Sequence, residues 1–111
     1  MSMNVKIKVW NSEEDIGYTQ ITTFFTDFSI ADEFGASAVQ DTYDRAFKEW
    51  KNDYKYLTEF VMVLNKKCWQ HYGEGNTELS ELYSDLFYKA KDYALDNLKD
   101  DELKYFLETT D

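Results

Sequence analysis

The first 25 residues contain two runs in which apolar and polar side chains alternate, a pattern typical of β-strands. Val5, Ile7 and Val9 alternate with two lysines, so a strand over residues 4–10 would have one apolar face. Residues 11–15 are polar and interrupt the pattern, and a second β-rich run extends from Tyr18 to Phe25. The two runs predict an antiparallel hairpin. Because a hairpin alone is marginally stable in water, it must pack on helices or pair with another chain.

From Ser29 onward the apolar positions recur every three or four residues, which is the period of an α-helix. A short helix is predicted over residues 29–34, capped by Asp27 or Ser29 and ended by Gly35. Further helices are predicted over residues 37–51, 54–72, 77–98 and 101–107. The predicted fold class is therefore α+β, with a two-stranded hairpin packed on a bundle of about four helices in one domain, residues 1–111.

The predicted helix over residues 54–72 is apolar on most of its sides. Such a helix lies either at the centre of a fold or at a subunit interface. The unpaired edges of a two-stranded hairpin also require cover. The sequence therefore allows a homodimer as one arrangement. The main stripe of this helix contains Leu57, Phe60, Val61, Leu64 and Cys68, and Tyr56, Met62, Val63 and Trp69 lie elsewhere around it.

Composition indicates a folded domain and not a disordered chain. The 111 residues are 43% hydrophobic and 18% aromatic, which is enough apolar material to form a core. Cys68 is the single cysteine, so no internal disulfide can form, and a lone thiol suits a reducing compartment. There is no signal-peptide pattern and no apolar run near the ~18 residues that span a bilayer. We therefore expect a cytoplasmic protein without a membrane segment.

The net charge of −10 limits the kinds of partner that the chain can bind. Direct binding to nucleic acid or to an anionic membrane would be opposed by this charge. The charge is uneven, because residues 45–67 carry six basic and three acidic side chains, whereas the flanking segments are strongly acidic. The expected partner is therefore a basic protein.

No residue pattern in the sequence predicts a catalytic, cofactor or metal site. His71 is the single histidine, and the sequence suggests no carboxylate or nucleophile to work with it, so a structural or surface role is predicted. Cys68 lies in an apolar stripe and is predicted to be buried and inert. The acidic run 100–102 lacks the spacing of a calcium loop and is better explained as the N-cap of the last helix. The four glycines form no phosphate-binding loop. A non-enzymatic protein is therefore predicted.

A row of carboxylates on the helix over residues 77–98 is the candidate binding surface. At 100° per residue its members lie within about 60° of arc, and they extend over about 27 Å of helix. Lys89 interrupts the widest gap, which is about 10.5 Å. In charge and rough pitch the row is similar to one strand of nucleic-acid phosphates. The simpler explanation is a solvated face that keeps the domain soluble, because any amphipathic helix of an acidic protein has a similar row. We call these residues the acidic row: Glu78, Glu81, Asp85, Asp92 and Asp96.

Three segments carry a resemblance to known proteins. They are DFSIADEFG (residues 27–35), DTYDRAFKEW (41–50) and YLTEFVMVLN (56–65). With these segments, residues 20–111 resemble small uncharacterised proteins of phages and mobile elements of Gram-positive bacteria. The resemblance implies no site residue, because that group has no established activity. The resemblance suggests an analogy, and only an analogy, with small acidic proteins that mimic DNA.

These observations favour one functional hypothesis over two others. The first is a non-enzymatic interaction protein of a phage or mobile element, an inhibitor of the DNA-mimic type that binds a basic, nucleic-acid-binding host protein. The second is a structural or assembly homodimer whose acidity only confers solubility. The third and weakest is a carboxylate-dependent enzyme.

Overall fold

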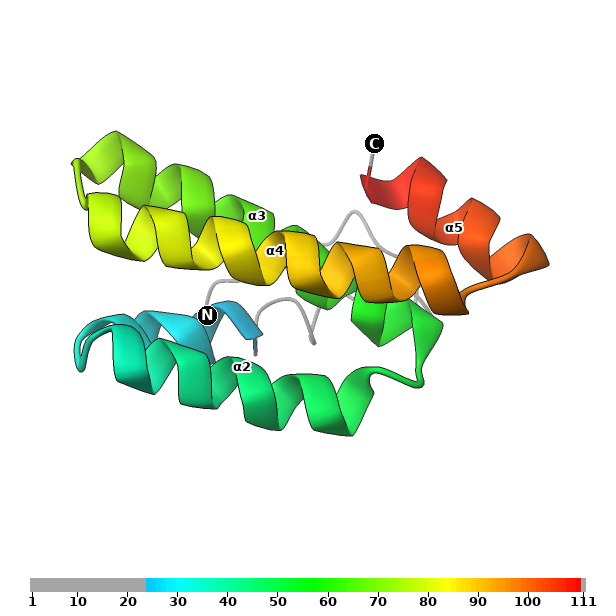
Figure 1. Ribbon diagram of the computed structural model, residues 1–111, viewed down its shortest axis with the longest axis horizontal. Helices are drawn as coiled ribbons and strands as arrows, with labels where there is room; N and C mark the ends of the chain where they lie inside the picture. Colours follow the sequence, from blue (N-terminus) through cyan, green and yellow to red (C-terminus); the bar gives the residue numbers. More distant parts are fainter. Residues whose placement is uncertain (1–23, 111) are drawn as a thin grey trace.

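The computed structural model describes residues 24–110, and every regular element in this range is an α-helix (Figure 1). Residues 24–32 are helical and lead through a turn at Gly35 into the next helix. Four helices of the described range, α2 to α5, follow the first one. Of these, α3 contacts each of the other three, α2, α4 and α5. Their bounds are α2, Ala36–Trp50; α3, Tyr54–Glu74; α4, Thr77–Asn97; and α5, Asp100–Thr110.

The predicted α+β class is wrong, because residues 24–110 form an all-α structure without a strand. The first predicted strand and most of the second lie outside the described residues. Where the second prediction can be compared, Phe24 and Phe25 are helical. In a strand these neighbours would point to opposite faces, whereas in the helix Phe24 joins Phe28 and Ala31 on one buried face. Burial of this face against the bundle therefore overrides the β propensity of the run.

The predicted bounds of α2, α3 and α4 are confirmed to within two residues. The first helix is the exception, since Asp27 and Ser29 lie inside it and therefore do not cap its start. The last helix is longer than predicted and continues to Thr110. Periodicity thus located the long helices well and the short ones poorly, because a short apolar pattern contains few repeats.

Local capping explains how α3 and α4 begin and why they lie next to each other. The carboxylate of Asp53 accepts hydrogen bonds from the backbone N–H groups of Lys55 and Tyr56 at the start of α3. At the other end Gly75 has φ 79°, and the Asn76 N–H bonds back to the carbonyl of His71, as in a Schellman motif. The Asn76 side chain then caps α4 by accepting from the Leu79 N–H. This tight turn makes α3 and α4 antiparallel neighbours.

Two glycines near this turn should respond oppositely to alanine. A Cβ at Gly75 meets no atom within 4 Å, so Gly75→Ala would suffer only from the left-handed backbone, at a cost of about 1 kcal/mol. Gly73 lies inside α3 with equally open space, so Gly73→Ala should stabilise the fold by about 0.5–1 kcal/mol. Urea unfolding of the two variants checks this pair. A loss of stability in both would contradict the helical, open environment assigned to Gly73.

The core is organised around α3, so this helix takes the central position, one of the two that its apolar surface allowed. Leu57, Phe60, Val61 and Leu64 are fully buried, and so is Val63 from outside the predicted main stripe. Cys68 is only half-buried, so the prediction of a fully buried thiol is wrong. The Phe60 ring also forms edge-to-face and tilted pairs with neighbouring rings, and such pairs stabilise a core beyond the area that they bury. Four rings from other helices have centroids within 6.4 Å of the Phe60 ring: Phe24, Phe28, Tyr43 and Phe47.

Candidate functional site

The acidic row lies on the outer face of α4, which extends along the molecule from the Gly75 turn to α5 (Figure 1). All five carboxylates are exposed, whereas the opposite face of the helix buries its apolar side chains. None of the five forms an ion pair with another residue of the described range 24–110. The structure therefore brings the predicted row together on one surface and leaves its charges free.

The basic side chains of α4 are turned towards aromatic rings. The ammonium group of Lys89 lies 6.0 Å from the ring centroid of Tyr43 on α2. The ammonium group of Lys91 lies 5.6 Å from the ring centroid of Phe87. Cation–π contacts of this length are weakly favourable at an exposed site. Lys89 interrupts the row in sequence, but its ammonium group contacts Tyr43 on α2 and forms no ion pair with the carboxylates of the row.

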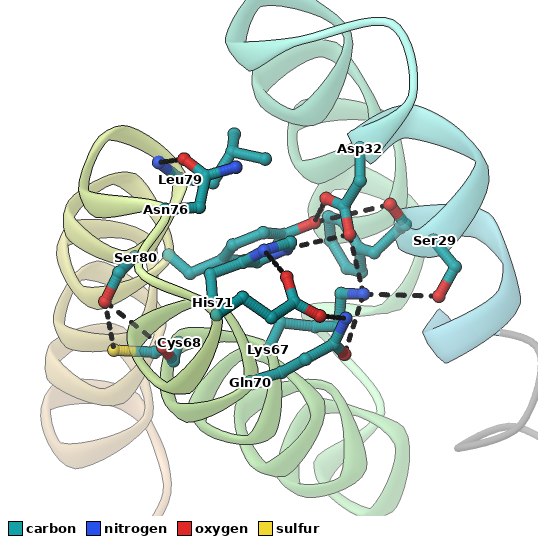
Figure 2. A network of polar contacts seen from close by, with 12 residues as sticks. Ser29, Asp32, Lys67, Cys68, Gln70, His71, Asn76, Leu79 and Ser80 are labelled. Atoms are coloured by element: carbon teal, nitrogen blue, oxygen red, sulfur yellow. Dashed lines mark hydrogen bonds and ion pairs between the residues drawn. The ribbon is translucent and has the colours of Figure 1, made fainter.

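A buried polar cluster, which was not predicted, joins the first helix to α3 and α4 around the carboxylate of Asp32 (Figure 2). One oxygen of Asp32 lies 2.6 Å from the Lys67 ammonium nitrogen and 2.8 Å from Nε2 of His71. The other oxygen accepts a hydrogen bond of 2.6 Å from the hydroxyl of Tyr83. Asp32 therefore contacts two basic groups and one phenol, each from α3 or α4.

Lys67 is completely buried, which is rare for a lysine and requires all of its donors to be satisfied. Besides Asp32, its ammonium group donates to Oγ of Ser29 at 3.2 Å and to Oε1 of Gln70 at 3.1 Å. The same group lies 4.8 Å from the ring centroid of Phe25. Three donors thus have three acceptors, so the buried charge is fully paired.

His71 lies between two carboxylates. Its Nε2 faces Asp32, and its Nδ1 lies 3.0 Å from Oε1 of Glu74 on the next turn of α3. The imidazole also stacks on Tyr83, with ring centroids 5.5 Å apart and planes 11° apart. Both ring nitrogens therefore lie within hydrogen-bond distance of a carboxylate oxygen, which fixes the orientation of the ring. Burial, together with the hydrogen bond to Asp32, raises the pKa of the Tyr83 phenol above its usual range.

One prediction about this region is wrong, and one buried residue was not predicted. His71 has carboxylate partners, Asp32 and Glu74, although the sequence had suggested none. Lys67 is a core residue. It follows Leu64 by three positions and precedes His71 by four, and this helical spacing places all three side chains on the same buried face of α3. Because Lys67 and His71 are almost fully enclosed, they present no face to a substrate. The cluster is therefore best explained as a polar link that orients three helices.

Glu59 is another buried ionisable residue that was not predicted, and it lies outside the Asp32 cluster. It is 1% exposed, and within residues 24–110 neither carboxylate oxygen has a hydrogen-bond partner. Burial raises the pKa of this carboxyl from 4.5 to about 7. An unpaired buried carboxylate is costly, so Glu59 tends to keep its proton in the folded chain.

The described residues contain neither a metal-binding cluster nor a membrane-spanning helix. In residues 24–110 no three histidine, cysteine or acidic side chains converge as a metal-binding set would. None of the helices in this range combines the length and the apolar composition needed to cross a bilayer. Comparison with protein families, curated proteins and solved structures finds no match to the chain. A functional interpretation therefore starts from the geometry of the acidic row.

Proposed function

We propose that this chain is a non-enzymatic interaction protein that presents the acidic row to a basic, nucleic-acid-binding protein in the cytoplasm, in the manner of a DNA mimic. The observation that carries the proposal is the row itself: five exposed carboxylates on one helix face, unpaired within the described residues. An origin in a phage or mobile element is part of the same proposal and follows from the resemblance of residues 20–111.

The dimensions of the row support contact with a surface that binds the DNA backbone. Five carboxylates over about 27 Å correspond to one charge per about 7 Å, roughly half the density of a single DNA strand. A rigid α-helix holds the charges in a fixed line, as a duplex holds its phosphates. Such a line provides long-range attraction towards a basic groove and therefore fast association.

Charge reversal of the row should weaken this binding far more than it changes stability. The probe is an HU-type nucleoid protein bound to a fluorescent DNA duplex, since this class contacts the DNA backbone. We expect the wild-type chain to displace the duplex at 50 mM salt and to lose most of that ability at 200 mM. Glu81→Lys/Asp85→Lys/Asp92→Lys should reduce displacement by about tenfold or more, because binding depends on these charges.

A matched control separates the row from net charge. Glu33→Lys/Asp44→Lys/Glu49→Lys reverses three exposed acids outside α4 and changes the net charge by the same amount. We expect this control to displace the duplex nearly as well as wild type. An equal loss in both triple variants would show that only total charge matters. Failure of the wild-type chain to displace the duplex at 50 mM salt would contradict the proposed function.

A further inference from the structure

An open groove of about 760 Å³ lies between the C-terminal half of α3 and the N-terminal half of α4. Trp69 and Tyr72 line it and are 62% and 69% exposed. Their rings meet edge to face, with centroids 5.6 Å apart and planes 83° apart. Two large aromatic side chains exposed side by side in a groove are unusual on a protein surface and are typical of an interaction site.

The groove is continuous with the acidic row. Glu81 belongs to the row and also lines the groove. Glu78 lies one turn before it and Asp85 one turn after it, both exposed on the same face of α4. Aromatic rings and a carboxylate thus line one groove, and further carboxylates lie next to it. This combination is complementary to a group that is both cationic and able to stack on a ring.

We propose that the groove receives an arginine side chain from the basic partner. This inference rests on the proposed function and names the group that the partner inserts. A guanidinium is planar and weakly hydrated, so it stacks on aromatic rings and also pairs with a carboxylate through two parallel hydrogen bonds. A lysine ammonium is strongly hydrated and offers no planar face. The row attracts any basic segment, and the groove selects arginine over lysine.

Peptide binding tests the selection directly. The probes are fluorescently labelled nona-arginine and nona-lysine, which carry equal charge, with dissociation constants measured by anisotropy at 50 mM salt. We expect the wild-type chain to bind nona-arginine about five- to tenfold more tightly than nona-lysine. Trp69→Ala and Tyr72→Ala, tested separately, should each weaken nona-arginine binding severalfold and leave nona-lysine binding nearly unchanged.

The control variant is Phe34→Ala, which removes another exposed aromatic side chain, 77% exposed, in the turn before α2. It should bind both peptides as the wild type does. Circular dichroism of each variant shows whether the helices are retained. The two groove variants remove exposed side chains at different positions of α3. If both weaken nona-arginine binding to a similar extent, loss of the ring contact explains the result better than a folding defect at one position.

The possible outcomes distinguish failure of the groove from failure of the acidic row. If the triple reversal of Glu81, Asp85 and Asp92 weakens both peptides while Trp69→Ala and Tyr72→Ala change neither, the row stands and the arginine groove is overturned. If the triple reversal changes neither peptide, the proposed function fails, and the groove inference fails with it. If sedimentation shows a wild-type homodimer that Trp69→Ala dissociates, the groove is covered by a second copy, which also overturns the arginine assignment.

Discussion

Asp32→Asn should lower the free energy of unfolding by about 3–5 kcal/mol, because it leaves the fully buried ammonium group of Lys67 without its counter-charge. Asn keeps the shape of Asp but removes the negative charge that both Lys67 and His71 face. The first helix is attached to α3 through these contacts, so its packing should loosen first. Urea unfolding followed by circular dichroism measures the loss, and hydrogen exchange of residues 24–32 shows where it occurs.

Two further variants make this test specific to a buried pair. Asp41→Asn removes the same charge from an exposed ion pair with Arg45, and its effect should stay within about 0.5 kcal/mol. Lys67→Met removes the buried charge itself and leaves Asp32 with His71 and Tyr83, so it should cost less than Asp32→Asn. Equal effects of Asp32→Asn and Asp41→Asn would show that the buried cluster contributes no more than a surface pair.

Glu59→Gln should make the chain more stable at alkaline pH and remove a pH dependence that the wild type has. In the unfolded chain the carboxyl loses its proton near pH 4.5, whereas in the folded chain burial raises its pKa to about 7. Between these values the folded state binds one more proton, so stability falls as the pH rises from about 4.5 to about 7. The full penalty, about 3 kcal/mol, is present above pH 7 and absent below pH 4.5.

Urea unfolding at pH 5 and pH 8 measures this effect. The advantage of Glu59→Gln over the wild type should grow by about 2–3 kcal/mol between the two pH values. Glu108→Gln, which removes an exposed carboxylate from α5, is the control and should show no such change. A constant difference between Glu59→Gln and the wild type at both pH values would mean that Glu59 ionises in the folded chain as it does in water.

Helix periodicity was sufficient to locate α2, α3 and α4 and the outer face of α4. The cap at Asp53, which was not predicted, and the glycine turn at Gly75 each depend on only a few neighbouring residues of the chain. Exposure of the acidic row followed from the same periodicity, because the side of α4 opposite a buried stripe must face solvent. Whether the row binds a partner is a separate question that the charge reversals test.

The buried cluster could not be predicted from local pattern. Asp32 and Lys67 are 35 positions apart in the chain and meet only because the first helix packs against α3. Within its own segment, Asp32 resembles any exposed acid near a helix end. The exposed aromatic pair of the groove was only partly indicated, because Trp69 was placed outside the main stripe of a helix that is apolar on most of its sides, whereas its contact with Tyr72 was not predicted.

The sequence by itself therefore determined the long helices and the line of charge along α4, because these depend on spacings of a few residues within one segment. Only the tertiary structure decided that Phe24 and Phe25 belong to a helix, that Lys67 lies in the core, and that Glu59 is buried with no hydrogen-bond partner among the described residues. The physical reason is that burial depends on what packs against a side chain, and those neighbours come from distant parts of the chain.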